Sequence, residues 1–357
     1  MKRIFVDTPT WFYSRRNTDW VLKQNLAKGL AEFGVVLRPG VWWNVVYNLL
    51  YVGQRLPLGP ISRWIKRIAP GVRARLVEHY HPDVFITQGE DPPIPTRCKI
   101  IWETYFLTDG TNTEFKRGGK AHWIRQMEAY GSQVSIIAVR GMASVELVKS
   151  MYPEYADKVR NLLFIKPEYD IVSEDFVREK QSTDGTVRLL FVGREAYRKG
   201  LDAVLAACET LYASGVLNFH LTIVSNLHNC SIEIPNVAWL THYRELPHVE
   251  VMKLMREAQI FIMPSRSESY GLVYHEAMAN GCVTFVRNGE PQREFVDYGR
   301  AGVCVSSNDI KGIFEEVSRC ISDKMLRISL ALSGLVLYQE KFCQFAITRA
   351  WREAIEE

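Results

Sequence analysis

Short apolar runs alternate with longer amphipathic segments along the whole chain. The runs that predict strands in the first half are Ile4–Val6, Val35–Leu37, Val84–Thr87, Ile100–Trp102 and Val134–Val139. Those in the second half are Leu189–Val192, Leu221–Val224, Val237–Leu240, Phe261–Met263, Thr284–Val286 and Gly302–Val305. Strands that alternate with helical patterns are typical of parallel α/β layers. We therefore expect an α/β fold with two Rossmann-like halves.

The length of 357 residues is more than one ordinary domain. Polar sequence with weak periodicity over residues 168–186 is the natural linker between the two sets of strands. We expect an N-terminal Rossmann-like domain over residues 1–167 and a C-terminal one over residues 187–340. Residues 341–357 are expected to form a last helix.

The composition is that of an ordinary globular protein, with 47% apolar and 24% charged residues. Met1–Arg3 runs straight into the first strand, which leaves no room for a signal peptide. No apolar run approaches the roughly 20 residues of a membrane helix. The seven cysteines are scattered without metal-ligand spacing, which favours a reducing compartment and argues against a zinc site. These features predict a cytoplasmic protein.

One segment, Pro264–Glu276, combines a strand end, a polar loop and a helix start. It follows the apolar run Ile260–Met263, and it places Glu268 in the loop, Gly271 at the helix start and Glu276 on the helix. A helix N-terminus offers unpaired N–H groups and partial positive charge, which suit a phosphate. Two carboxylates beside such a cradle suit a ligand with hydroxyls on both sides of a diphosphate. The plain interpretation is a solvated strand-loop-helix unit.

A second segment, Phe191–Gly200, places Arg194 and Lys199 just after the predicted strand Val187–Val192. Open α/β sheets bind ligands at the carboxyl ends of their strands. A planar guanidinium and a compact ammonium suit a diphosphate. A basic pair in a loop is by itself usually a solvated surface. Beside the glutamate segment, we interpret it as the second half of one site.

The two segments resemble motifs of glycosyltransferase family 4, which are retaining enzymes with the GT-B fold. Glu268 and Glu276 resemble the family's paired glutamates, and the Gly-Arg…Lys-Gly frame around Arg194 and Lys199 resembles its upstream motif. The resemblance covers the second half well and the first half loosely. It implies two Rossmann-like domains that face each other across a cleft, with a last helix that crosses back and could be anchored by Trp351.

The resemblance also implies a nucleotide-diphosphate sugar as donor and a role for each residue. Glu268 would lie near the donor sugar's hydroxyls and Glu276 near the ribose hydroxyls, while Arg194 and Lys199 would stabilise the diphosphate as charge builds. The further expected donor contacts are Ser269, Tyr270, Gly271, Leu272, Val273, Ser225, Asn226 and Tyr243. The base loops do not separate uridine from guanosine, so a UDP- or GDP-linked sugar is expected, with no cofactor.

The chain also lacks certain motifs. No Asp-x-Asp occurs, so the usual carboxylate pair for a divalent ion is missing and we expect a metal-independent enzyme. Without Gly-x-Gly-x-x-Gly or Gly-Lys-Ser/Thr loops, dehydrogenase and P-loop interpretations are weaker.

Two features of the first half depart from the common family pattern. The loop Asp7–Trp11 stands where many members carry a Gly-Gly pair, which leaves the first-domain donor contacts open. Trp102-Glu103-Thr104 occupies the point where some members place a histidine, and other branches carry Glu-Thr. Glu103 is therefore a candidate catalytic residue for acceptor or sugar contact, with a helix-capping carboxylate as the alternative.

The stretch Phe33–Val77 contains no acidic residue and concentrates positive charge in a chain whose formal net charge is +4. Its basic and aromatic residues are Arg38, Arg55, Arg63, Lys66, Arg67, Arg73, Arg75, Trp42, Trp43, Tyr47, Tyr51 and Trp64. Such a mixture suits an anionic membrane interface, whereas no nucleic-acid motif supports binding to nucleic acid. A solvated basic face over ordinary core aromatics is the alternative.

These patterns together predict a retaining, metal-independent glycosyltransferase of the hexosyltransferase type. We expect a glycan, lipid-linked or lipopolysaccharide-type acceptor and a role in cell-surface polysaccharide synthesis, with peripheral attachment to the inner face of the membrane as a hypothesis. The alternatives are a catalytically silent binding subunit and another GT-B enzyme, such as a phosphorylase or a sugar-nucleotide epimerase.

Overall fold

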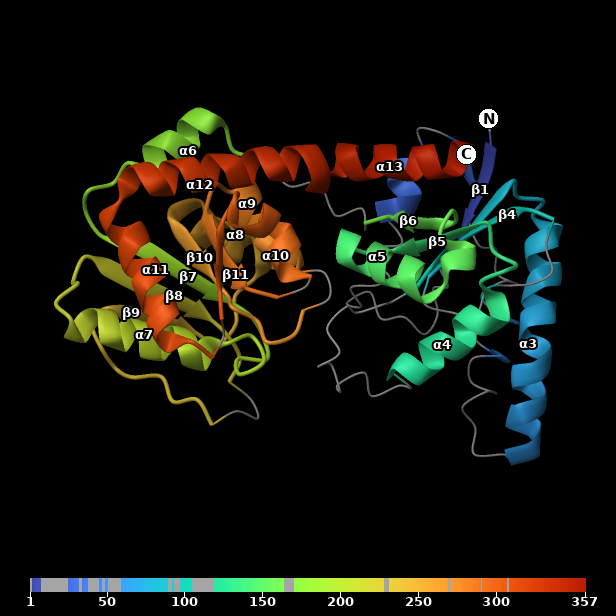
Figure 1. Ribbon diagram of the computed structural model, residues 1–357, viewed down its shortest axis with the longest axis horizontal. Helices are drawn as coiled ribbons and strands as arrows, with labels where there is room; N and C mark the ends of the chain where they lie inside the picture. Colours follow the sequence, from blue (N-terminus) through green and yellow to red (C-terminus); the bar gives the residue numbers. More distant parts are fainter. Residues whose placement is uncertain are drawn as a thin grey trace. The chain divides into compact units, whose positions relative to one another are not determined.

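The computed structural model describes residues 2–7, 25–31, 34–37, 45–46, 49–50, 59–88, 92, 97–104, 119–163, 170–227, 231–268, 271–289, 291–306 and 308–357. The chain divides into two compact units, shown in Figure 1. Unit 1 comprises Met1–Glu168 and Cys343–Glu357, and unit 2 comprises Tyr169–Phe342. Each unit is built around its own parallel sheet and its own apolar core.

Unit 1 has, within the described residues, a six-stranded parallel sheet in the order β2-β1-β3-β4-β5-β6. Its strands are β1 (Lys2–Val6), β2 (Gly34–Leu37), β3 (Val84–Gln88), β4 (Lys99–Glu103), β5 (Ile136–Val139) and β6 (Val159–Asn161). Its helices are α3 (Gly59–His79), α4 (Gly119–Tyr130), α5 (Met142–Met151), the 3₁₀ turn η1 (Pro153–Tyr155) and α13 (Gln344–Glu356). The inner strands are almost entirely apolar because helices cover both faces of a parallel sheet.

The last helix, α13, belongs to unit 1 although the whole of unit 2, Tyr169–Phe342, separates it in sequence from the rest of that unit. Trp351 is 1% exposed and packs with β-strand residues such as Ile4 and Ile101. Its indole Nε1 donates to the carbonyl of Leu163 at 2.7 Å. The helix therefore completes one apolar layer of the unit.

Unit 2 has a second six-stranded parallel sheet in the order β12-β11-β10-β7-β8-β9, again counted within the described residues. Its strands are β7 (Val187–Val192), β8 (Phe219–Val224), β9 (Leu240–Tyr243), β10 (Ile260–Ile262), β11 (Val283–Arg287) and β12 (Val303–Val305). Its helices are α6 (Glu174–Gln181), α7 (Leu201–Ala213), α8 (His248–Glu257), α9 (Leu272–Ala279), α10 (Gln292–Phe295), α11 (Ile310–Ser322) and α12 (Lys324–Leu337), with the turns η2 (Asp297–Gly299) and η3 (Tyr338–Phe342). The predicted α/β fold class with two Rossmann-like sheets is confirmed.

The region 168–186, expected to be a linker, instead contains α6 and belongs largely to unit 2. Ser173 caps this helix by accepting from the N–H of Phe176 at 3.2 Å. Gln181 is fully buried and donates to the carbonyls of Gln259 and Gly281 at 3.0 and 2.8 Å. Polar composition concealed the helix, because the amide N–H groups of its buried glutamine bond to backbone carbonyls of distant residues.

Two edge strands differ from the sequence prediction. Strand β9 lies at Leu240–Tyr243 rather than at Val237–Leu240, and β6 at Val159–Asn161 was not expected. Both are the last strand of their sheet and are only partly buried. An edge strand with one covered face carries a weaker apolar signal than a central one.

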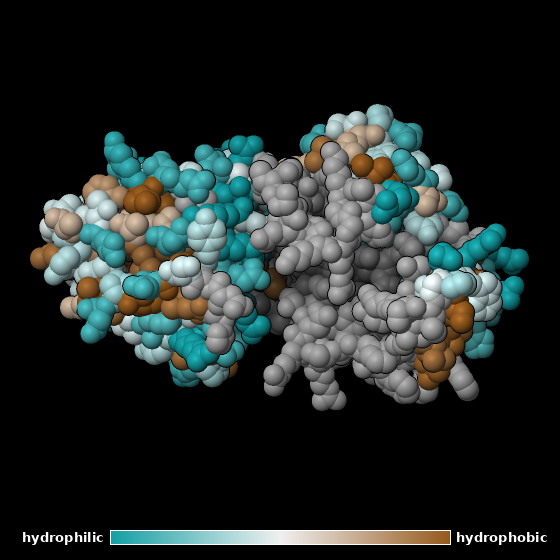
Figure 2. Space-filling model, turned by 90° about the horizontal axis from the view of Figure 1, so that it is seen from below, coloured by the Kyte–Doolittle hydropathy of each residue, from teal (hydrophilic) through white to brown (hydrophobic). Residues whose placement is uncertain are grey.

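Hydrophobic residues also reach the surface among hydrophilic ones, as Figure 2 shows by colour. Examples in unit 2 are Leu217 and Met325, whose exposed fractions are 65% and 66%. Isolated exposed apolar side chains are normal for a globular protein and assign no function by themselves.

Candidate functional site

The candidate site lies at the carboxyl edge of the unit 2 sheet. Strand β10 pairs with β7 so that Phe261 is opposite Leu190, and β7 pairs with β8 so that Val192 is opposite Val224. The loops that follow these parallel strands therefore emerge at one edge, which is where open α/β sheets bind ligands. These loops carry most of the donor-site residues predicted from the sequence.

Lys199 and Glu268 form a largely buried ion pair at this edge. The ammonium of Lys199 donates to Oε2 of Glu268, and the two side chains are 12% and 11% exposed. Burial lowers the pKa of Lys199, and the negative charge of Glu268 opposes that shift. Gly193 leaves room for the lysine stem, because a Cβ there would lie 3.0 Å from Cγ of Lys199.

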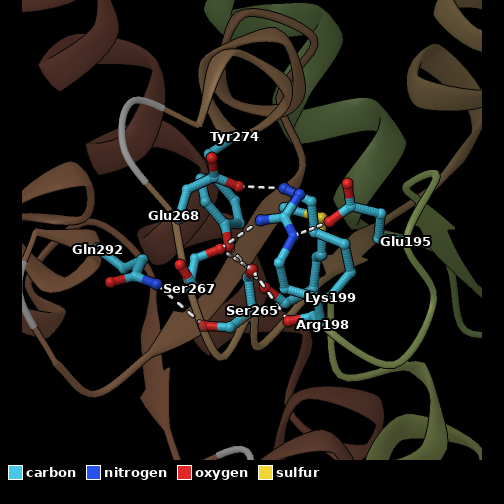
Figure 3. A network of polar contacts seen from close by, with 9 residues as sticks. Glu195, Arg198, Lys199, Ser265, Ser267, Glu268, Tyr274 and Gln292 are labelled. Carbon is cyan, nitrogen blue, oxygen red and sulfur yellow. Dashed lines mark hydrogen bonds and ion pairs between the residues drawn. The ribbon is translucent and has the colours of Figure 1, made fainter. Parts of the chain in front are cut away.

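Hydrogen bonds join the loop that ends at Lys199 to the loop that carries Glu268, as Figure 3 shows. The guanidinium of Arg198 donates to the carbonyl of Ser267 at 2.6 Å, and Ser265 Oγ donates to the same carbonyl at 2.8 Å. The N–H of Arg266 donates to the carbonyl of Arg198 at 2.8 Å. These bonds hold the two loops together, and they thereby fix the backbone positions of Lys199 and Glu268 relative to each other.

A bidentate ion pair also joins the loop that carries Glu268 to helix α7. Arg266 donates to both carboxylate oxygens of Asp202 at 2.7 and 2.8 Å, which is the fork geometry that makes arginine–carboxylate pairs specific. Its guanidinium also stacks 4.2 Å above the ring of Tyr197.

Helix α9 begins beside Glu268 through a glycine in the left-handed conformation. Gly271 has φ +60°, and a Cβ there would meet the ring of Tyr274 at 2.4 Å. The hydroxyl of Tyr274 donates to the carbonyl of Met263 at 2.7 Å, which ties the helix back to the end of β10. Leu272 and Val273 occupy the first helical positions, where N–H groups have no partner within the helix. Ser269 and Tyr270 lie outside the described residues.

Glu276 on α9 faces His248, the first residue of α8. The distance from His248 Nε2 to Glu276 Oε1 is 3.2 Å, and the side chain of Glu276 is 11% exposed while that of His248 is 57% exposed. The hydrogen bond to Glu276 raises the pKa of His248 above its ordinary value.

A cavity of about 530 Å³ opens at the ends of β7, β8 and β9. Its lining includes Arg194, Ser225 and Asn226 from the predicted site, with Arg244 and Glu245 beside them. The side chain of Arg194 is 92% exposed, and its guanidinium lies 4.0 Å from the carboxylate of Glu245. Arg194 therefore lines the cavity and makes no recorded contact with Lys199 or Glu268. Tyr243 is 40% exposed at the end of β9.

Glu103 lies at the end of β4 in unit 1, where it is 2% exposed. Arg140, at the end of β5, donates to its Oε1 at 2.7 Å. Asp7, at the end of β1, forms a similar buried pair with Arg73 of α3 at 3.0 Å. Both carboxylates at this edge of the unit 1 sheet are thus neutralised by arginines of the same unit.

The described residues of the basic stretch Phe33–Val77 differ in how far they are exposed to solvent. Arg73 is 6% exposed and pairs with Asp7, so it is not part of a basic surface. The first half of α3 is exposed, with Ile61 and Trp64 at 53% and 60% and with Arg63 and Arg67 beside them. Arg75 is also exposed. The other predicted contacts, Arg38, Trp42, Trp43, Tyr47, Tyr51 and Arg55, lie outside the described residues, as does the side chain of Lys66.

The described residues contain neither a membrane-spanning helix nor a cluster of metal-binding side chains. No helix there is long and apolar enough to span a bilayer. No group of three or more histidine, cysteine, aspartate or glutamate side chains there is placed to hold a metal ion.

Comparison with known proteins identifies unit 2. Residues 172–331 match the family described as "Glycosyl transferases group 1". This part of the chain is similar to group 1 glycosyltransferase domains. The Lys199–Glu268 pair and the cavity that contains Arg194 both lie within the matched residues of that domain.

A curated relative matches a longer part of the chain. The chain is 23% identical over 256 residues to "Glycogen synthase" of Mycobacterium tuberculosis, a match that covers 68% of this chain and 58% of that protein. The chain spans about half the length of the curated relatives it matches, from 42% to 58%.

Two solved structures share the fold over nearly the full chain. Anabaena Alr3699/HepE, in complex with UDP and glucose, has a TM-score of 0.63 at 13% identity, and the superposition covers 100% of both chains. WaaG, a glycosyltransferase involved in lipopolysaccharide biosynthesis, has a TM-score of 0.61 at 14% identity and is covered over 99% of both chains.

Sequence reasoning did not single out Arg198, Asp202, His248 and Arg266. Arg198 and Arg266 stand inside the two quoted motifs, so their positions were in view but their roles were not. Asp202 and His248 carry no sequence signal, because their partners are 64 and 28 residues away. Only the folded chain brings these pairs together.

Proposed function

We propose that this glycosyltransferase retains the anomeric configuration and moves a hexose-type sugar from a nucleotide-diphosphate donor to a glycan, lipid-linked or lipopolysaccharide-type acceptor. Its role would lie in cell-surface polysaccharide synthesis. The observation that carries the proposal is the buried Lys199–Glu268 pair at the carboxyl edge of the unit 2 sheet. The pair sets one cation beside one hydrogen-bond acceptor, and binding of a sugar diphosphate would use both groups.

Lys199 and Arg194 are proposed to stabilise the diphosphate leaving group. Lys199 is fixed by Glu268 and by the joined loops, so its charge is already oriented when the donor arrives. Preorganised charge in a site sheltered from water is worth more than the same charge in solution. Arg194 is exposed, and its 4.0 Å contact with Glu245 holds it weakly. It can therefore turn toward a bound diphosphate at little cost.

Glu268 is proposed to accept hydrogen bonds from hydroxyls of the donor sugar. The N–H groups of Leu272 and Val273, with Gly271 before them, would receive diphosphate oxygens at the positive end of α9. Ser269 and Tyr270 would belong to the same set. Gly271 permits this helix start, because its left-handed backbone disfavours other residues and a Cβ there would meet the ring of Tyr274 at 2.4 Å.

The nucleoside is proposed to occupy the cavity at the ends of β7, β8 and β9. A volume of about 530 Å³ is ample for a nucleoside. The hydroxyl of Ser225 is buried and has no hydrogen-bond partner among the described residues, so it is a ready contact beside Asn226. Tyr243 and Glu276 would complete this part of the site. The base would be uracil or guanine.

The transfer step is proposed to need no metal and no cofactor. Lys199, Arg194 and the α9 N-terminus would take the charge that a divalent ion would otherwise neutralise. In a front-face reaction, the glycosidic C–O bond to the diphosphate breaks while a hydroxyl of the acceptor bonds to the same face of the sugar. A leaving phosphate oxygen takes the hydroxyl proton. Glu103, already paired with Arg140, would act on the acceptor side.

Thermal stabilisation by a panel of ligands tests the proposal. UDP, GDP, UDP-glucose and GDP-mannose would each be added to the full chain, and the nucleotide that raises the melting temperature identifies the base. Donor turnover with a polysaccharide or lipid-linked acceptor would then be followed for the wild type and for Glu268→Gln, which should abolish it. Binding without turnover would indicate a silent subunit, and epimerisation of the donor without transfer would indicate an epimerase.

The acceptor side is proposed to meet an anionic membrane through the exposed first half of α3. Ile61 and Trp64 would enter the interface while Arg63 and Arg67 contact lipid phosphates. This would place a cytoplasmic protein at the inner face of the membrane. Sedimentation with vesicles of phosphatidylcholine and phosphatidylglycerol should pellet the wild type but not Trp64→Ser/Arg67→Gln, and an equal absence of binding in both would rule the surface out.

A further inference from the structure

His248 stands at the entrance to the predicted ribose contact. It is the first residue of α8, and its Nε2 lies 3.2 Å from Oε1 of Glu276 on α9. The glutamate side chain is 11% exposed, while the histidine ring is 57% exposed. The two residues come from adjacent helices, so the contact is a product of the fold and not of a local turn.

The chemistry of the pair fixes the direction of the hydrogen bond. An ionised carboxylate only accepts, so His248 must carry a proton on Nε2, either as the neutral tautomer or as imidazolium. The bond occupies Oε1. The described residues supply no hydrogen-bond partner for Oε2, so that oxygen remains available as an acceptor.

We propose that His248 is a positioning residue that holds the Glu276 carboxylate in the orientation needed to accept hydrogen bonds from the two ribose hydroxyls of the donor. The inference rests on the proposed function, because it takes Glu276 as the ribose contact. It adds a specificity device at a residue outside the two motifs quoted from the sequence. His248 acts through Glu276 and touches no reacting atom.

The physical reason is the freedom of a glutamate side chain. A carboxylate without a fixed partner samples several rotamers, and each must be restricted when the ribose binds. His248 removes that cost in advance and leaves Oε2 and the spare lone pairs of Oε1 for a vicinal diol. A carboxylate held in this way distinguishes a ribose from a 2′-deoxyribose, because the deoxy sugar leaves one oriented acceptor unused.

Discrimination between ribose and deoxyribose is therefore the measurement. Calorimetric titration of the full chain with UDP and 2′-deoxy-UDP, and with GDP and 2′-deoxy-GDP, gives the ratio of dissociation constants for the base that binds. The wild type should prefer the ribonucleotide by about tenfold, the order expected for a hydrogen bond to a charged group. His248→Leu should reduce that preference to about threefold or less.

Two matched variants separate positioning from a general structural effect. His248→Gln carries an amide N–H near the place of Nε2 and should keep most of the preference. Val249→Ala lies on the same first turn of α8, with 65% of the side chain exposed, and should behave as the wild type. A loss of overall affinity with the preference intact in His248→Leu would mean a merely structural role.

The results of these titrations distinguish a failure of the proposed function from a failure of the proposed role of His248. If the wild type binds neither UDP nor GDP, the proposed function fails and the inference fails with it. If the wild type binds a nucleotide and prefers the ribose form, but His248→Leu prefers it equally, the inference alone is overturned. If His248→Leu loses the preference and His248→Gln retains it, the inference is supported.

Discussion

The Lys199–Glu268 pair shows what a single residue contributes at this edge of the sheet. Both side chains are largely buried, at 12% and 11% exposed, and they form an ion pair with each other. Burial alone would favour the neutral lysine, and the glutamate favours the charged form. In the proposed function, a charge held in this way would act on the leaving group rather than on the ground state of the donor, and kinetics can test this.

Lys199→Ala should lower turnover far more than it lowers the affinity for the donor. Removing one preorganised charge stabiliser costs about 100-fold to 1,000-fold in kcat, so kcat and kcat/KM should fall together by about that factor. The donor KM should change by less than about fivefold. Steady-state kinetics check this, with Lys253→Ala, an exposed lysine paired with Glu250 at 2.8 Å, as the control. A large rise in KM at unchanged kcat would refute the role.

The pKa of His248 should respond to Glu276. The hydrogen bond raises the pKa of His248 above the ordinary 6.5, so protonation of this histidine stabilises the fold below the ordinary value and the stabilisation fades as pH rises through the raised pKa. Histidine NMR titration should therefore show a higher pKa for His248 in the wild type than in Glu276→Gln. His220, whose pKa burial lowers, should titrate equally in both proteins.

At the scale of elements, the site depends on how closely two loops can approach. Gly200 begins α7 with φ +81°, and a Cβ there would lie 2.6 Å from the carbonyl oxygen of Pro264. The glycine thus serves both a backbone conformation and a contact between the loop after β7 and the loop after β10. Because those loops carry Lys199 and Glu268, the contact sets the spacing of the site.

Gly200→Ala should destabilise the fold by more than the conformational cost alone. Gly215 offers the control, since its φ is +89° and nothing lies within 4 Å of a Cβ placed there. Gly215→Ala should cost about 1 to 2 kcal/mol for the left-handed backbone, and Gly200→Ala about 1 to 3 kcal/mol more for overpacking. Denaturant unfolding of both variants measures the difference. Equal losses would mean that the loops move apart freely.

The burial of each element explains which elements the sequence predicted. Central strands such as β7 and β10 are continuous apolar runs, because a parallel sheet is covered on both faces. Strand β6 and helix α6 gave weaker patterns, the first as a half-buried edge and the second because its polar face dominates. Local composition reports burial only where an element is buried on all sides.

At the scale of the whole molecule, each unit has a core of its own, and α13 belongs to the first although it ends the chain. Units with separate cores can unfold separately. A substitution that destabilises only one core should therefore shift only one of two unfolding transitions. Helix α13 provides a direct test, because its apolar face is buried in unit 1.

Trp351→Ala should lower one of two calorimetric transitions and leave the other in place. Removing a tryptophan that is 1% exposed, together with its 2.7 Å hydrogen bond to Leu163, should cost about 3 to 5 kcal/mol. Phe345→Ala on the same helix, where the side chain is 76% exposed, should change neither transition by more than about 0.5 kcal/mol. A shift of both transitions in Trp351→Ala would show that the units unfold as one.

The sequence alone determined the fold class and the two segments that carry the candidate site, because apolar periodicity and strand-end chemistry are local properties. It placed Lys199 and Glu268 at the ends of strands, 69 residues apart. Only the tertiary structure decided that the two side chains meet, that Glu103 and Asp7 are neutralised by arginines, and that His248 faces Glu276. Strand order and helix packing choose these partners, and sequence distance carries no information about either.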